Sequence, residues 1–163
     1  MEQKRMSKKA GVIALIVFVV GAVLLGMLLL NKGDGPVTGM ILSSQPIADS
    51  TAYKATTEAP DETVYLVVSN ALNQFEVDHQ STIASGVPLV ATVSFVECPA
   101  GTAFTGSWLK DGEPLAASTA QTETEPYGVL AFSLEGAMVT TGDYTFVLSD
   151  ASGELFRQAF RVE

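Results

Sequence analysis

An uncharged run of 21 residues, from Ala10 to Leu30, constrains this chain more than any other feature. As a helix it would be about 32 Å long at about 1.5 Å per residue, enough to cross a hydrocarbon core of about 30 Å. A secretory signal has a shorter apolar region, of roughly 7–15 residues, followed by a small-residue cleavage site. The run is too long for such a signal, and the residues from Leu28 to Lys32 offer no such site. The sequence therefore predicts an uncleaved transmembrane signal-anchor helix at residues 10–30.

The charges on either side of this run predict its orientation. Four basic residues and one acid precede it, whereas five basic residues and seventeen acids follow it. Because positively charged flanks stay in the cytoplasm, residues 1–9 are predicted to be a cytoplasmic basic tail. Residues 31–163 are predicted to be extracytoplasmic, so the chain is expected to be a single-pass protein of the cell membrane.

The same charge balance bears on partners. An acidic chain lacks the basic footprint that nucleic-acid binding requires, so we expect no nucleic acid. We expect contact with the membrane through residues 10–30, and with another envelope protein or a surface polymer through the rest. Ala22 and Gly26 form a small-xxx-small pair, the kind that lets membrane helices pack closely, and this leaves a homodimer open.

Residues 31–63 differ in character from the run before them. They are rich in Gly, Pro, Ser, Thr and Ala, and they show neither helical nor strand periodicity. This composition predicts a flexible extracytoplasmic stalk with a reach of roughly 30 Å, which would hold the following domain clear of the lipid headgroups. The alternative is that "GMILSS" (39–44) forms a short strand that packs on the domain.

From residue 64 onward the apolar residues alternate with polar ones, as in half-buried strands. Asp111-Gly112 is a two-residue hairpin signal, and "SDASGE" (149–154) marks a second turn. About seven strands are expected, at 64–68, 87–95, 104–110, 114–118, 130–134, 144–148 and 156–162. This pattern predicts an all-β domain at 64–163, an antiparallel sandwich of two sheets.

Two of these strands carry a recognisable pattern. Trp108 lies on the third predicted strand, and Gly142-Asp143-Tyr144 opens the next-to-last one. This arrangement resembles the immunoglobulin-like (Ig-like) fold. Residues 104–163 are also similar to small Ig-like modules of bacterial envelope proteins and lipoproteins, which carry W-x-x-x-G, F-x-L, G-x-Y and F-x-V motifs. The resemblance covers about residues 64–163.

The resemblance implies an Ig-like β-sandwich with two particular side chains in fixed roles. Trp108 would be the core tryptophan, and Tyr144 would be the tyrosine-corner residue, its hydroxyl bonded to upstream backbone. The chain departs from antibody domains in lacking paired cysteines, and from the lipoproteins in having a helix anchor. These motifs are core and turn positions, so they indicate a fold rather than an activity.

The candidate catalytic motifs are weak. Ser107 and Lys110 match the S-x-x-K pattern of penicillin-binding enzymes. That pattern requires a helix, because residues three apart on a strand point to opposite faces. His79, the only histidine, is expected in a solvated loop between strands. Cys98, the only cysteine, is expected at a strand end, either buried and inert or joined to a second chain.

Metal binding also lacks a recognisable pattern. One histidine and one cysteine are too few for an imidazole or thiolate cluster. Acids are spread among loops at both ends of the predicted domain without the spacing of a calcium loop: Asp111, Glu113, Glu123, Glu125, Asp143 and Asp150. We therefore expect no catalytic residues, no cofactor and no metal site, and we expect that the chain is not an enzyme.

The function expected from the sequence is a non-catalytic binding or structural role for an acidic Ig-like module displayed at the cell envelope. Contact is expected through the loops around Asp111 and Asp150, or through apolar residues on outer sheet faces, namely Val90, Val96, Leu109, Val147 and Leu155.

Two alternatives to this function remain open. The first is a pilin-like filament subunit, in which a hydrophobic helix leads closely into a β-rich head and a processing site precedes the helix. "KKAGV" (8–12) matches such a site loosely. The second is an accessory subunit of a larger membrane complex.

Overall fold

The computed structural model describes residues 35–123 and 127–163. Within these ranges it contains one α-helix, one 3₁₀ turn and nine strands. The elements are β1 (Val37–Ser43), α2 (Ser50–Glu58), β2 (Val64–Ala71), β3 (Gln74–Gln80), β4 (Leu89–Val96), β5 (Ala103–Lys110), β6 (Glu113–Gln121), β7 (Tyr127–Leu134), η1 (Gly136–Met138), β8 (Gly142–Asp150) and β9 (Gly153–Val162).

The predicted basic tail and anchor, with Ala22 and Gly26, lie outside the described residues. In the described part of the chain, no helix has the length and apolar character needed to cross a membrane.

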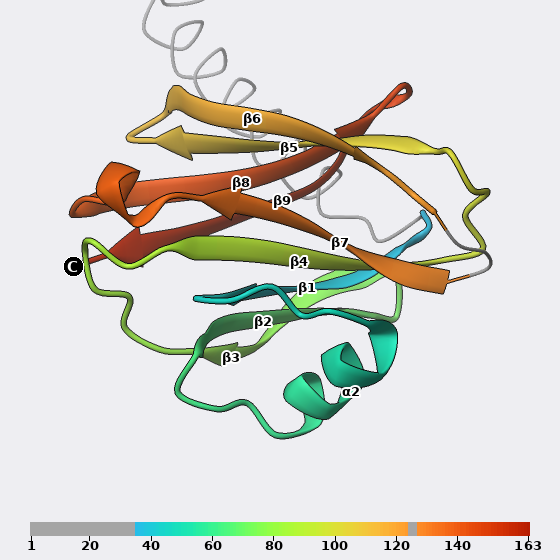
Figure 1. Ribbon diagram of the computed structural model, residues 1–163, viewed down its shortest axis with the longest axis horizontal. Helices are drawn as coiled ribbons and strands as arrows, with labels where there is room; N and C mark the ends of the chain where they lie inside the picture. Colours follow the sequence, from blue (N-terminus) through green and yellow to red (C-terminus); the bar gives the residue numbers. More distant parts are fainter. Residues whose placement is uncertain (1–34, 124–126) are drawn as a thin grey trace, which may run out of the picture.

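The strands form two antiparallel sheets that face each other (Figure 1). One has five strands in the order β3-β2-β1-β4-β7, and the other has four in the order β6-β5-β8-β9. The domain is therefore an all-β, two-sheet antiparallel sandwich, as the alternation after residue 64 predicted.

The core between the sheets consists of the apolar faces that the sequence predicted. Trp108 is 1% exposed, and its ring centroid lies 4.8 Å from that of Phe146 on the neighbouring strand β8. Phe132 of the opposite sheet lies 5.8 Å from Phe146 and closes the gap between the layers. Because opposed aromatic rings fill the space from both sides, the sheets are held by apolar burial rather than by a disulfide.

The hairpin predicted at Asp111-Gly112 is confirmed. The two residues join β5 to β6 with φ angles of 51° and 86°. Two consecutive positive φ values match the right-handed twist of the flanking strands, which is why Asp-Gly favours this turn.

The prediction of a flexible stalk at 31–63 is wrong for most of that segment. Residues 37–43 form β1, which lies between β2 and β4 in the middle of the five-stranded sheet. Ile41 and Leu42 are both fully buried although they point to opposite faces. The alternative, a strand at "GMILSS", is the correct one, and the domain begins at β1 rather than at residue 64.

Helix α2 follows within the same segment. The side chain of Asp49 accepts hydrogen bonds from the backbone N–H groups of Thr51 and Ala52, both at 2.8 Å. This is the capping interaction that satisfies the free N–H groups of a first helical turn. The helix is therefore specified locally, although none of its residues is fully buried.

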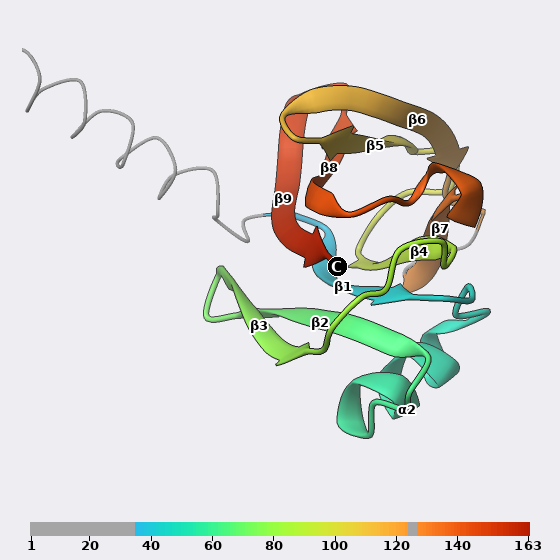
Figure 2. The same ribbon diagram turned by 90° about the vertical axis from the view of Figure 1, so that its left-hand side faces the viewer.

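Seven of the nine strands form a three-on-four sandwich, and the other two extend one sheet. Strands β1, β4 and β7 oppose the four-stranded sheet, whereas α2, β2 and β3 all lie in the connection between β1 and β4. Figure 2 shows these three elements together on one side of the sandwich. The addition covers the outer face of one sheet, and this has consequences for the surface described next.

Candidate functional site

The four-stranded sheet carries an apolar hollow of about 450 Å³ on its outer face. Directly opposed residues share a face of a sheet, and the pairings place Ala117, Ser107, Val147 and Arg157 in one row across β6, β5, β8 and β9. Leu109 lies next to this row on β5, where it is partly exposed. The outer-face prediction is therefore correct for Leu109 and Val147, which line the same hollow.

Strand β6 supplies much of the rest of the hollow. Its irregular pairing after Trp108 sets Pro114 opposite Leu109 and leaves Leu115 as the extra residue of a bulge. Pro114 and Ala117 are exposed. Since β6 is an edge strand, proline and a bulge here also disfavour uncontrolled pairing with other strands. The hollow is thus open at the edge of the sheet.

Arg157 borders the hollow on the side of β9. Its Nε donates to Glu154 Oε1 at 2.9 Å and its second nitrogen donates to Glu154 Oε2 at 2.7 Å. This two-point hydrogen bonding with the carboxylate raises the pKa of Arg157. The guanidinium is therefore held at the rim, in a fixed orientation, and its charge is matched.

The other predicted outer-face residues do not join this surface. Val90 lies on β4 of the five-stranded sheet and is 4% exposed. Leu155 is partly buried and packs against the main core. Val96 is 40% exposed but lies at the end of β4, on the other sheet. The alternation rule gave their direction without showing which sheet each strand joins.

The outer face of the five-stranded sheet is covered, in contrast to the other one. Tyr53 of α2 and Ile47 pack on a small cluster of Ile41, Val64 and Val67. The backbone N–H of Ile47 also donates to Thr92 Oγ1 at 3.3 Å. The polar residues that alternation assigned to solvent on β4 are therefore buried under the added segment.

Gly39 makes room for this cover. A Cβ on Gly39 would lie 2.6 Å from the hydroxyl oxygen of Tyr53, so any larger residue there would displace the tyrosine. Burial raises the pKa of Tyr53 to about 12, and the nearby Ser94 hydroxyl acts in the opposite direction. The side chain stays neutral at physiological pH and serves packing.

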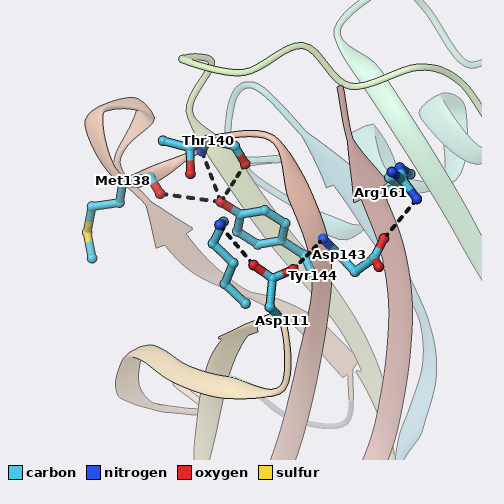
Figure 3. A network of polar contacts seen from close by, with 7 residues as sticks. Asp111, Met138, Thr140, Asp143, Tyr144 and Arg161 are labelled. Carbon is cyan, nitrogen blue, oxygen red and sulfur yellow. Dashed lines mark hydrogen bonds and ion pairs between the residues drawn. The ribbon is translucent and has the colours of Figure 1, made fainter.

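The loop around Asp111, the other predicted contact region, is tied into the fold (Figure 3). Asp111 Oδ1 accepts from the backbone N–H of Asp143 at 3.1 Å, and Lys110 Nζ lies 3.0 Å from Oδ2. The backbone hydrogen bond from Asp143 and the bond from Lys110 lower the pKa of Asp111. Asp143 in turn lies 3.5 Å from Arg161. These carboxylates are occupied by internal partners and are not arranged to receive a ligand.

The tyrosine corner predicted for Tyr144 is present in the same region. The Tyr144 hydroxyl donates to the carbonyl of Thr140 at 2.9 Å and accepts from the N–H of Thr140 at 3.0 Å. It also lies 3.4 Å from the carbonyl of Met138, and the side chain is 1% exposed. A buried phenol that satisfies backbone groups four residues upstream holds the β7–β8 connection against the core.

The loop around Asp150 is likewise closed on itself. Asp150 Oδ1 accepts from the backbone N–H of Ser152 at 2.7 Å and from its hydroxyl at 2.5 Å. This is the side-chain bonding by which Asp stabilises a turn. Like the Asp111 loop, it shows a structural role.

The remaining predicted residues do not come together. Ser107 pairs with Val147 on the outer face, whereas Lys110 pairs with Tyr144, so the S-x-x-K residues point apart as expected for a strand. His79 lies on β3 opposite Val67 and is half-buried, so the prediction of a solvated loop is wrong. Cys98 is 3% exposed and belongs to the main core. Among the described residues, no group of three potential metal ligands is found.

A larger hollow of about 850 Å³ lies where the edges of β6 and β7 approach the start of α2. Asp49, Gln121 and Tyr127 are among the residues that line it. Sequence reasoning missed this feature because it depends on α2, which was not predicted. Its lining adjoins residues 124–126, which lie outside the described ranges.

Comparison with known proteins gives a resemblance of the fold alone. No family model matches the chain, and no curated protein matches it. Among solved structures, the chain is similar to an immunoglobulin-like protein from Pseudomonas aeruginosa, with 15% sequence identity and a TM-score of 0.36. The match covers 63% of this chain and 94% of that one. At the level of the fold, the chain resembles bacterial Ig-like modules.

Proposed function

We propose that this chain is a single-pass, membrane-anchored extracytoplasmic protein that displays an acidic Ig-like module in a non-catalytic binding role at the cell envelope. The observation that carries the binding role is the difference between the two outer faces. One is covered by α2 and the segment before it, whereas the other presents the hollow around Leu109 and Val147. The partner is another envelope protein or a surface polymer.

The chemistry of the open face favours a partner with a small apolar group. The hollow combines Leu109, Pro114, Leu115 and Ala117 with a single charged side chain, the paired Arg157. Contact surfaces in general have an apolar centre and a polar rim. Arg157 and Glu154 would form part of that rim and would fix the orientation of the partner more than its affinity.

The rest of the described surface supports a role without catalysis. In the described ranges, the four lysine and arginine side chains all form ion pairs, namely Lys54–Glu58, Lys110–Asp111, Arg157–Glu154 and Arg161–Asp143. A reactive site would instead bring perturbed titratable groups together in a hollow. The hollow on the four-stranded sheet contains one titratable residue, Arg157, whose charge is already matched.

A photo-crosslinking experiment in intact cells tests the contact face. A photoreactive amino acid is placed at Ala117, which faces the hollow, or at the adjacent Ser118, which points to the opposite side of β6. We expect a discrete crosslinked product from position 117 and none from position 118. The change Ala117→Glu, combined with a crosslinker at Pro114, should abolish that product. Equal products from both positions, or a product that survives Ala117→Glu, would overturn the proposed face.

A pilin-like filament subunit is the second candidate, and one observation favours it. Strand β1 begins at Val37, so seven residues lie between it and position 30, in place of the long stalk expected from the sequence. A close junction of a hydrophobic helix and a β-rich head is what a pilin needs. The two candidates differ in processing, because a pilin would be cleaved near the start of the hydrophobic run.

A further inference from the structure

The β2–β3 hairpin ends in an unusual turn. Its two central residues, Leu72 and Asn73, have φ angles of 52° and 61°. Such a turn favours Asn and Gly, which adopt positive φ with little strain, whereas leucine rarely adopts it. Leu72 is also 96% exposed, so it gains no burial within the fold. A strained and fully exposed leucine points to a contact made outside the domain.

This turn lies beside the point where the chain enters the sandwich. Strands β1 and β2 are antiparallel, with Gly39 opposite Ser69. The side-chain nitrogen of Asn70 donates to the carbonyl of Val37 at 3.2 Å. Because the end of β2 meets the start of β1, the tip of the hairpin and the first described residues occupy the same end of the sheet.

Two more exposed apolar side chains lie at this end. Val96 closes β4 and is 40% exposed, and Tyr127 opens β7 and is 59% exposed. The two are directly opposed in the sheet, and the N–H of Val96 donates to the carbonyl of Pro36 at 2.8 Å. Among the described residues, this end therefore carries three of the five large apolar side chains that are exposed. Together we name Leu72, Val96 and Tyr127 the apolar rim.

The length of chain before β1 restricts where this end can be. Only residues 31–34 separate Leu30, the last residue of the predicted anchor, from Gly35. Five residue-to-residue steps span at most about 18 Å when fully extended. The headgroup layer on each side of the hydrocarbon core is several ångströms thick. An anchor that ends at Leu30 therefore holds this end of the sandwich at or just above the headgroups.

We propose that the apolar rim rests on the headgroup region of the bilayer in which the chain is anchored. This inference rests on the proposed anchor. Tyrosine is enriched at membrane interfaces because its ring is apolar and its hydroxyl is polar, and an exposed leucine adds apolar contact. Glu97 and Glu123 are exposed near the same end, so they would be repelled by anionic lipid. The matching surface is therefore a bilayer of zwitterionic lipid.

Fluorescence quenching in vesicles tests this contact. The full chain is reconstituted in phosphatidylcholine vesicles that contain a lipid with a nitroxide headgroup, and a fluorophore is attached at Leu72→Cys. The control is Met138→Cys, an exposed apolar position in η1 after β7, at the opposite end of that strand from Tyr127. Cys98 is left in place because its thiol is buried, and the unsubstituted chain measures any labelling there.

We expect several-fold stronger quenching at position 72 than at position 138, and weaker quenching at position 72 when half of the lipid is anionic. Equal quenching at the two positions, in protein that resists extraction by alkaline carbonate, would overturn the contact while the anchor stands. Extraction by carbonate would overturn the anchor itself. Self-quenching between labelled chains without lipid quenching would show that a second copy covers the tip, and would also overturn the inference.

Discussion

Gly106 of β5 lies directly beneath the ring of Phe132, which reaches it from β7 of the opposite sheet. A Cβ on Gly106 would lie 2.5 Å from both Cδ1 and Cγ of that ring. Glycine is therefore required here for close packing of the two layers rather than for an unusual backbone angle.

The first prediction follows from this contact. Gly106→Ala should lower the free energy of unfolding by about 1–3 kcal/mol, because an added methyl in a filled core displaces its neighbours. Urea unfolding of the purified domain measures the loss. Gly35→Ala is the matched control, since nothing lies within 4 Å of a Cβ at that position. Equal effects of the two changes would contradict the packing account.

The tyrosine corner gives the second prediction. Tyr144→Phe should cost about 1–3 kcal/mol, because it leaves the buried backbone groups of Thr140 without their partner. The same measurement on Tyr65→Phe, at a partly exposed site, should show a change within about 0.5 kcal/mol. A Tyr144→Phe variant as stable as the unsubstituted protein would show that the corner bond is dispensable.

The third prediction concerns the start of the domain. A fragment of residues 35–163 should fold, whereas a fragment of residues 64–163 should not, because its five-stranded sheet would lose the middle strand β1. Removing β1 would expose the partner edges of both β2 and β4. Amide chemical-shift dispersion measures folding in each fragment. A well-dispersed spectrum from residues 64–163 would restore the idea that the preceding segment is a stalk.

The fourth prediction concerns the charge network at the β5–β6 turn. The backbone N–H of Asp143 and the ammonium group of Lys110 hold the pKa of Asp111 below its ordinary value of 3.8. A carboxyl whose pKa is lowered on folding stabilises the fold above its unfolded pKa. That stability is lost as the pH falls through the lower, folded value.

An NMR titration of the Asp111 carboxyl checks this direction. The midpoint should lie below 3.8, and Lys110→Met should raise it, because one of the two interactions is lost. Lys54→Met is the control, since Lys54 pairs with Glu58 on α2. A midpoint that does not respond to Lys110→Met would show that the ion pair has no effect in solution.

The strands that the sequence revealed are those with one buried and one solvated face. Alternation located β2 and β4 to β9 and identified the core residues Trp108 and Tyr144. It failed for β1, which is buried on both faces between the core and the cover of α2, and so shows no alternation. It also failed for β3, a polar edge strand in which Phe75 is the one fully buried residue.

The candidate contact surface was predictable only in part. Leu109 and Val147 interrupt the polar faces of their strands, and this was visible in the sequence. Their meeting in one hollow depends on β5 and β8 being neighbours, which follows from long-range pairing. The burial of Val90 depends on which sheet β4 joins and on what covers it. Helix α2 had one local signal, Asp49 as a capping residue, but its short Thr- and Ala-rich sequence has no apolar stripe.

The mass and N-terminal sequence of the mature chain, purified from membranes, test the central claim most directly. An anchored module predicts a chain that retains residues 1–30 and stays in the membrane after alkaline carbonate treatment. Cleavage near Ala10 would instead identify a pilin-like subunit. A mature chain that begins after residue 30 and leaves the membrane would contradict the proposed anchor and, with it, the proposed contact of the apolar rim with lipid.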